Sequence, residues 1–281
     1  MKKCFAVLWS ALVLFLHGMA LAGDGFVFLA STIGPIDSGV VALLEDSFEK
    51  ETGIRVRHVG AGTGAALKIS QKGQVDLVMV HAKSLEEKFI QEGYGTERIP
   101  LMYNDFVLVG PKTDPAVIKG LPSAKAALQA VAAKGSPFIS RGDKSGTHVA
   151  EMELWGKAGV IPSGSWYKVY EKGNEGNVAT LRYADQTGAY TFIDRATYLS
   201  IKDQIKLTIL VEGDQDLLNF ISLIPVNPAK FPKVNAKDAK TFIDWLAAPD
   251  KGQRIIRDFG KDRYGSPLFF PNSEAWRKKN P

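Results

Sequence analysis

Four segments rich in glycine, serine and threonine offer the chemistry of an anion site. They are residues 31–39, 60–64, 140–147 and, less clearly, 173–180, and each lies where a predicted strand passes into a helix. The first backbone N–H groups of a helix have no partner within it, and with the positive end of the helix dipole they bind anions without a lysine. Serine and threonine hydroxyls add donors. The pattern therefore predicts a site for a small anion.

The segment with the most specific chemistry contains Arg141. Residues 140–148 read Ser-Arg-Gly-Asp-Lys-Ser-Gly-Thr-His. A guanidinium beside a helix N-terminus suits a carboxylate or a tetrahedral anion, because its planar fork donates two parallel hydrogen bonds. Two structural alternatives stay open: a segment of this composition is often only a capped turn, and Arg141 can form a salt bridge with Asp143. For Arg195, which follows Asp194, we expect a structural ion pair.

The histidines and serines do not form a catalytic pattern. Ser145 and His148 share one helical turn, and no carboxylate is specified to orient the histidine. The sequence has neither a Gly-x-Ser-x-Gly elbow nor a His-Glu-x-x-His metal motif. His58 and His81 are dispersed, as ordinary polar or capping histidines are. We therefore expect a binding protein and not an enzyme, with no cofactor and no metal site of its own.

Alternating strands and helices position these segments in the first part of the chain. Three short apolar runs predict buried strands, at residues 26–30, 56–59 and 76–80. A segment of helical spacing follows each of them, at residues 40–52, 63–72 and 84–91. Asp37 and Ser38 offer an N-cap for the first of these helices. Such alternation predicts a parallel sheet covered on both faces, in which ligands bind beyond the carboxyl ends of the strands.

The chain is expected to enter a second lobe and to return. An apolar run at residues 106–111 is typical of a strand that leaves the first lobe, and helix–strand–helix spacing recurs over residues 122–158. A predicted buried strand at 220–226 and predicted helices at 236–259 then bring the chain back to the first lobe. We predict lobe I from residues 23–108 and 221–281, and lobe II from 109–220. Two α/β lobes, each a mostly parallel sheet flanked by helices, with a two-strand hinge, are typical of the type II periplasmic binding fold.

Residues 1–22 predict an export signal. Two lysines precede an apolar run at residues 5–16, and residues 20–22 read Ala-Leu-Ala, the small-x-small pattern before a cleavage site at Gly23. The run is too short for a bilayer-spanning helix, and Cys4 precedes it, so neither a membrane anchor nor an acylated cysteine is expected. Cleavage would leave no cysteine and hence no disulfide. We expect a periplasmic protein that is monomeric.

The charge pattern argues against a nucleic-acid partner. The whole chain carries a formal net charge of +5, which falls to +3 without the two lysines of the leader. Its basic residues are scattered and usually have acidic neighbours, as at residues 83–88 and 258–263. A nucleic-acid surface needs a basic stripe, and none is visible.

Short motifs along nearly all of the chain after the leader carry a resemblance. They are DSG at 37–39, FEKETG at 48–53, GTG at 62–64, EKF at 87–89, GYG at 93–95, MYNDF at 102–106, the 140–148 segment, GAYT at 188–191 and DRATYL at 194–199. Together they resemble the tungstate-binding proteins of ABC transporters, which are related to molybdate and sulfate binders. The resemblance implies a tungstate- or molybdate-type oxyanion as ligand and a membrane permease as partner.

The resemblance also implies which residues bind the oxyanion. They are Ser31, Thr32, Thr63, Gly64, Arg141, Ser145 and Thr147. The chain departs from the family in loops that face the ligand. Where the family reads Thr-Thr-Thr-Ser, this chain has Ser31-Thr32-Ile33-Gly34, so two hydroxyls are replaced by an apolar side chain and a glycine. The family's His-Asp-Pro is His81-Ala82-Lys83 here, and its Gly-x-Gly-Met-Gly is GNEGN at 173–177.

These departures leave alternatives for the ligand and for the partner. An unsatisfied oxygen of a buried anion costs about 1–3 kcal/mol, so the loss of two hydroxyls should weaken tungstate binding or shift the preference. One alternative is a paralogue that binds another anion, either sulfate-like or a carboxylate in contact with Ile33. Another is that the protein presents its ligand to a membrane sensor kinase instead of a permease.

Overall fold

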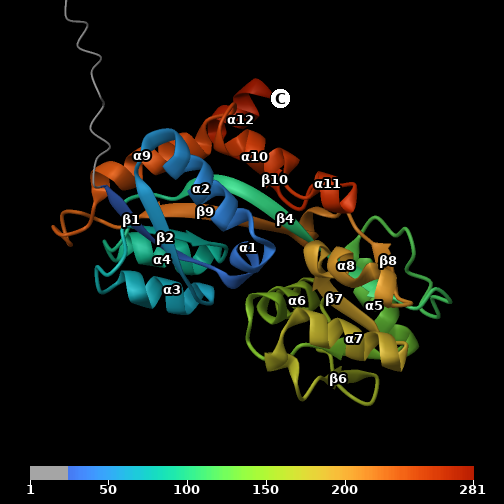
Figure 1. Cartoon of the computed structure of the whole chain (residues 1–281). Helices are drawn as coiled ribbons and strands as arrows, with labels where there is room; N and C mark the ends of the chain where they lie inside the picture. The colour runs from blue at the N-terminus through green and yellow to red at the C-terminus, as the bar shows by residue number, and fades with distance from the viewer. Residues whose placement is uncertain (1–24) are drawn as a thin grey trace, which may run out of the picture.

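The computed structural model describes residues 25–281 and shows two α/β lobes (Figure 1). This confirms the predicted fold class. The predicted leader, with Cys4 and the cleavage site at Gly23, lies outside the described residues. Within the described part of the chain, no helix is both long and apolar enough to cross a membrane.

The sheet of the first lobe contains the parallel strands predicted from the N-terminal half. Its strand order is β2 (Arg55–Gly60), β1 (Phe26–Ser31), β3 (Leu77–Val80), β9 (Leu218–Pro225) and β4 (Ile99–Gly110). Strand β1 pairs in parallel with β2 and β3, whereas β9 is antiparallel to β3 and β4. The short β10 (Phe270–Pro271) adds an antiparallel pair to β4. The sheet is therefore parallel on one side and mixed where β9 enters it.

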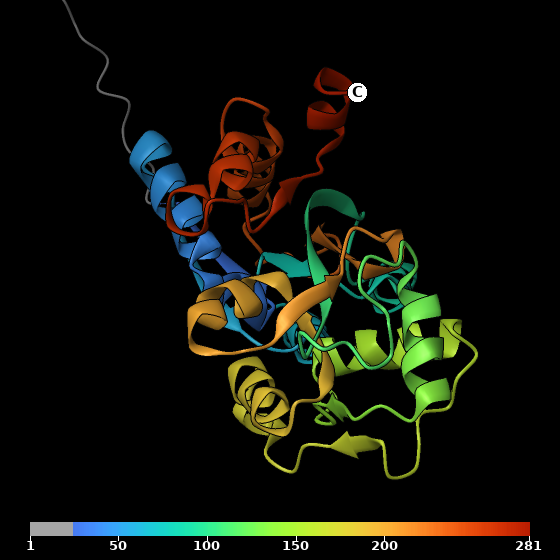
Figure 2. The same cartoon turned by 90° about the vertical axis from the view of Figure 1, so that its right-hand side faces the viewer.

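Helices cover both faces of this sheet. The N-terminal ones are α1 (Ile33–Ser38), α2 (Val40–Thr52), α3 (Thr63–Ser70) and α4 (Lys83–Gln91), and the C-terminal ones are α9 (Ala236–Ala247), α10 (Gly252–Asp258), α11 (Lys261–Tyr264) and α12 (Glu274–Lys279). Helices α9 and α10 contact α2, and Figure 2 shows the red C-terminal helices beside the blue N-terminal ones. The N-terminal and C-terminal parts of the described chain therefore share one hydrophobic core.

The start of α2 differs from the prediction. Asp37 and Ser38 belong to the short helix α1 and do not occupy the N-cap position, although the Ser38 hydroxyl accepts a hydrogen bond from Val40 N–H, the first N–H of α2, at 3.3 Å. Gly39 separates the two helices with φ of 88°, a left-handed conformation that glycine adopts at low cost, and is itself the N-cap of α2. The apolar spacing was nevertheless correct, since Val40, Leu44 and Phe48 are all buried.

Strand β4 joins the two lobes. Its first half pairs with β9 as far as Asp105, and from Phe106 onward it pairs with β7 (Tyr190–Asp194) and β8 (Thr208–Val211) of the second lobe. The strand was expected only from residue 106, because Asn104 and Asp105 interrupt the apolar run. The lobe boundaries after residues 108 and 220 remain predictions.

The second lobe repeats the strand and helix alternation. Strand β5 (Phe138–Ser140) pairs in parallel with β6 (Tyr167–Val169) and β7. Its helices are α5 (Ala124–Lys134), α6 (Gly146–Lys157), α7 (Asn177–Thr187) and α8 (Arg195–Ile201), with 3-10 turns at Gly173–Glu175, Lys202–Gln204 and Gln215–Leu217. Phe138, Trp155 and Tyr190 are fully buried in its core. Strand β5 therefore aims the 140–147 segment, and with it the N-terminus of α6, toward the first lobe.

Candidate functional site

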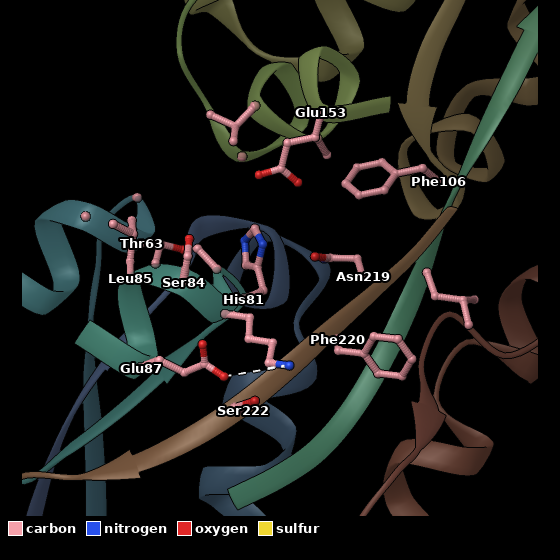
Figure 3. A pocket seen from close by; sticks show the side chains of 18 of the residues that line it. Thr63, His81, Ser84, Leu85, Glu87, Phe106, Glu153, Asn219, Phe220 and Ser222 are labelled. Atoms are coloured by element: carbon pink, nitrogen blue, oxygen red, sulfur yellow. Dashed lines mark ion pairs between the residues drawn. The ribbon is translucent and has the colours of Figure 1, made fainter. Parts of the chain in front are cut away.

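A cavity of about 1030 Å³ lies between the two lobes. Its lining comes from the starts of α3 and α4 in the first lobe, from α6 in the second lobe, and from the strands β4 and β9. Figure 3 shows Thr63, Ser84 and His81 on one side and Glu153 of α6 on the other, with Asn219 of β9 beside them. Two of the four predicted segments, 60–64 from the first lobe and 140–147 from the second, therefore contribute to its lining.

The N-terminus of α3 opens into this cavity. Gly62, the N-cap, is extended and has no side chain with which to cap the helix. The first helical hydrogen bond runs from the Ala66 N–H to the Gly62 carbonyl at 2.9 Å. The N–H groups of Thr63 and Gly64 precede that bond, and both residues line the cavity. This end of α3 can therefore donate to an anion from the first lobe.

The N-terminus of α6 lines the same cavity from the second lobe. Its N-cap Ser145 accepts a hydrogen bond from the His148 N–H at 3.4 Å. The Nδ1 atom of His148 accepts from the Lys144 N–H at 2.9 Å, and partial burial lowers the pKa of this histidine. Ser145 and His148 thus fix the turn instead of forming a nucleophile and base. Gly146, the first residue of α6, faces the cavity.

The first predicted loop does not contribute to the cavity lining. Ser31 and Thr32 are buried, and Thr32 is the N-cap of α1. Among residues 25–281, the Oγ1 atom of Thr32 has no hydrogen-bond partner. A buried hydroxyl without a partner is unusual and is a feature of ligand sites. Ile33 is 45% exposed, and its Cδ1 would lie 3.0 Å from a Cβ built on Gly60.

All three guanidinium nitrogens of Arg141 contact residues of the second lobe. Its Nε donates to the Gly173 carbonyl at 3.1 Å, one terminal nitrogen donates to the Asn177 side chain, and the other pairs with Asp143 at 2.9 Å. The salt bridge to Asp143, one of the alternatives stated for this residue, is therefore present. The arginine links the 140–147 segment to the 173–180 segment, and it does not belong to the cavity lining within the described residues.

Arg195 forms the structural ion pair that was expected of it. Its guanidinium donates to both carboxylate oxygens of Asp105, at 2.5 to 2.9 Å, and pairs with Glu212 at 2.7 Å. These contacts raise the pKa of Arg195. The neighbouring Asp194 instead caps α8 by accepting from the Thr197 N–H. Arg195 therefore ties α8 to β4, the strand that joins the lobes.

The buried carboxylate of Glu151 stabilises the segment that contains Arg141. Glu151 of α6 is 1% exposed and accepts hydrogen bonds from Ser140 at 2.8 Å, Tyr167 at 2.8 Å and Trp155 at 3.2 Å. Burial, opposed in part by these hydrogen bonds, raises the pKa of Glu151 to about 7. The end of β5 is thus fastened to the middle of α6, and this holds the turn between them.

The structure brings only some of the predicted residues onto the cavity surface. Thr63 and Gly64 line it, whereas Ser31, Thr32, Arg141, Ser145 and Thr147 do not. The sequence interpretation placed Lys144 and Gly146 in the 140–147 segment and His81 in a loop facing the ligand without counting them as ligand residues, and it missed Glu153 and Asn219 altogether. His81 follows β3 directly, so the rule that ligands bind beyond strand ends could have found it. Within residues 25–281, no group of three or more His, Cys, Asp or Glu side chains is placed to hold a metal ion.

Comparison with known proteins decides the family. The model of the PBP superfamily domain matches residues 22–250. The chain belongs to the PBP superfamily. The tungstate-binding protein TupA of Peptoclostridium acidaminophilum is 44% identical to this PBP superfamily member over 251 residues, which cover 89% of this chain and 86% of that protein. A putative ABC transporter anion-binding protein of Haloferax volcanii is 44% identical, over 91% of this chain and 75% of that protein.

This PBP superfamily member also shares its fold with a solved structure. The tungstate-binding protein TupA from Desulfovibrio alaskensis G20 superposes with a TM-score of 0.82 at 40% sequence identity. The match covers 89% of this chain and 100% of that one. Both lobes and the strands between them are therefore shared with a protein described as a tungstate binder.

Proposed function

We propose that the protein captures a small oxyanion of the tungstate or molybdate type in the cavity between its lobes and delivers it to an ABC importer. The observation that carries this proposal is that the N-termini of α3 and α6, one from each lobe, line the same cavity. Two helix N-termini facing one space supply backbone donors and positive dipole ends from opposite sides. The names of the relatives support an oxyanion as the ligand.

The proposed ligand set comes from both lobes. Thr63 and Gly64 donate from α3, and the first loop adds Ser31 and Thr32, whose Oγ1 has no partner among residues 25–281. From the second lobe the set includes Arg141, Ser145 and Thr147. Ser145 accepts through its oxygen in the cap of α6, so its O–H remains free to donate. Arg141 stays in the set through its positive charge and because its contacts with Gly173, Asn177 and Asp143 hold the segment that leads into α6.

Calorimetry with sodium tungstate, sodium molybdate and sodium sulfate tests the proposal. We expect tungstate and molybdate to bind at one site per chain, and saturation at one hundred times the dissociation constant should stabilise the protein by about 2.7 kcal/mol. If none of the three anions gives heat or a thermal shift at millimolar concentration, the oxyanion proposal is wrong.

A second candidate ligand is a carboxylate, and the exposed Ile33 favours it. This side chain offers an apolar contact beside the N-terminus of α3, where the family has a hydroxyl. Replacing Ile33→Thr and Gly34→Ser should raise tungstate affinity by about 1–3 kcal/mol if the loop reaches the ligand. Leu43→Thr, at a similarly exposed position on α2, is the control and should change nothing. Unchanged binding in the double variant would favour the carboxylate.

We further propose that the protein is periplasmic, monomeric and without catalytic activity, with the permease of an importer as its partner. The family supports a solute-binding role. A membrane sensor kinase is the alternative partner. Genes for a permease and an ATPase beside this one would favour import, whereas a histidine kinase gene there would favour sensing.

A further inference from the structure

The two lobes touch at His81 and Gly146. Gly146 is the first residue of α6, and a Cβ built on it would lie 2.7 Å from Cε1 of His81 and 3.3 Å from Nε2. Carbon atoms that are not bonded make their best contact at about 3.5–4.0 Å, so a side chain at this position would overlap the ring. The imidazole therefore lies against the bare backbone of the opposite lobe.

Two paired asparagines, Asn219 of β9 and Asn104 of β4, lie next to the ring of His81. Its neighbour in the cavity lining is the side chain of Asn219, and Asn219 Nδ2 donates to Asn104 Oδ1 at 2.7 Å. Asn104 and Asn219 are directly paired across β4 and β9. Burial lowers the pKa of His81, which favours the neutral ring. Figure 3 shows the ring upright in the cavity, between Ser84 on one side and Asn219 on the other, with Glu153 of α6 above it.

The backbone at Gly146 does not itself require glycine. Positive φ angles in this segment belong to Gly142 and Lys144, and Gly146 has none. An alanine at the first position of a helix is therefore tolerated by the backbone and favoured by helix propensity. The neighbouring ring is what makes a Cβ costly here.

We infer that His81 is a mechanical stop that sets how closely the two lobes approach, and that Gly146 is the surface on which it rests. The inference deepens the proposed function and rests on it, since the stop would fix the distance between the N-termini of α3 and α6. That distance decides the size of the oxyanion that both helices can contact. The S–O bonds of sulfate are shorter than the W–O bonds of tungstate, so His81 would help to select the larger ion.

The test compares Gly146→Ala with Gly156→Ala by calorimetry with sodium tungstate. Both glycines lie in α6, and a Cβ at Gly156 would meet nothing within 4 Å. We expect Gly146→Ala to weaken binding by about tenfold or more, because one helix N-terminus is held away from the ion, and Gly156→Ala to stay within about twofold. Neither variant should melt at a lower temperature than the wild type.

A rescue experiment separates the stop from a merely structural effect. Adding His81→Ala to Gly146→Ala should recover most of the lost tungstate affinity, because the overlap disappears. His81→Ala alone should bind sulfate relatively better against tungstate than the wild type does. If Gly146→Ala binds like the wild type, or if the double variant binds no better than Gly146→Ala, the inference is wrong.

Failure of the proposed function would look different. In that case the wild type itself would give no heat with any of the three anions. Small-angle scattering would still decide about the stop, because Gly146→Ala should have a larger radius of gyration than Gly156→Ala if the ring limits the approach of the lobes. Equal radii would overturn the inference.

Discussion

At the scale of single residues, Arg141 shows how a charged side chain can serve a site without lining it. Its three nitrogens connect Gly173, Asn177 and Asp143, so the guanidinium orders two glycine-rich segments at once. Such a planar fork holds several acceptors in fixed directions, which a flexible ammonium cannot do. The positive charge remains close to the N-terminus of α6, where an anion is proposed to bind.

The first prediction concerns this fork. Arg141→Lys keeps the charge but loses the fixed geometry, and it should weaken tungstate binding by about 1–3 kcal/mol in calorimetry. Arg195→Lys is the control, because Arg195 contacts Asp105 and Glu212 and not the 140–147 segment. The control should lower the melting temperature with little change in affinity. The reverse pattern, intact binding in Arg141→Lys and lost binding in Arg195→Lys, would place the anion elsewhere.

The second prediction uses the raised pKa of Glu151. Its folded-state pKa of about 7 exceeds the ordinary value of 4.5, so the folded protein holds the proton more tightly than the unfolded chain does. The resulting stability is present below the ordinary value and is lost as the pH rises through about 7. Between pH 4.5 and about pH 8, this group alone should lower the free energy of unfolding by on the order of 3 kcal/mol.

Denaturation at about pH 5 and about pH 8 checks this prediction. Glu151→Gln removes the titration, so its stability relative to the wild type should increase toward the higher pH. Glu153→Gln, on the exposed side of the same helix, should show no such trend. A constant difference between Glu151→Gln and the wild type at both pH values would contradict the account.

Single residues were the hardest part to predict from sequence. Thr63 and Gly64 could be predicted because their function follows from the start of a helix after a strand. His81 and Asn219 could not be paired, because they are far apart in the sequence and meet only through the packing of β3 against β9. Likewise, nothing local distinguishes Gly146 from Gly156, and only the opposite lobe shows which of them lies in contact.

At the scale of elements, the N-terminus of α6 combines a cap, a tight turn and a proposed ligand group. Ser145 caps the helix, Lys144 adopts a φ of 62°, and its N–H is held by His148. A positive φ in a non-glycine residue is uncommon and persists where surrounding contacts enforce it. The turn is therefore built for its position at the cavity rather than for stability alone.

The third prediction compares two serine caps in the second lobe. Ser145→Ala removes the cap of α6, and Ser123→Ala removes the equivalent cap of α5, where the serine accepts from the Ala126 N–H. Each change should lower the free energy of unfolding by about 1 kcal/mol. Only Ser145→Ala should also weaken tungstate binding, by about tenfold, because its hydroxyl is a proposed donor. Equal affinities in the two variants would remove Ser145 from the ligand set.

Most elements could be predicted from their spacing, and the exceptions have clear causes. Apolar spacing placed α2, α3 and β3 to within a few residues. The first half of β4 was missed because Asn104 and Asp105 break its apolar pattern, although both are satisfied inside the structure by Asn219 and Arg195. A polar residue whose partner is distant in sequence cannot be distinguished locally from a loop residue.

At the scale of the whole molecule, β4 and the return to β9 connect two hydrophobic cores, with the cavity between the lobes. One hydrophobic cluster forms around Phe48 and Phe242 in the first lobe and another around Phe138 and Trp155 in the second, and α8 of the second lobe also packs against the first cluster through Ala196 and Leu199. Separate cores with few linking strands are the arrangement that permits hinge closure around a ligand. The two-lobed layout could be predicted from the return of strand and helix spacing, whereas the contacts across the cleft could not.

The most direct test of the whole account is the position of the bound ion in a crystal. Crystals of the protein grown with sodium tungstate, measured at an absorption edge of tungsten, would show the metal as an anomalous peak. We predict one strong peak between the N-termini of α3 and α6, within hydrogen-bonding reach of the Thr63 and Gly146 N–H groups. A peak elsewhere, or no peak in crystals of protein saturated with tungstate, would contradict the claim that the two lobes close on an oxyanion.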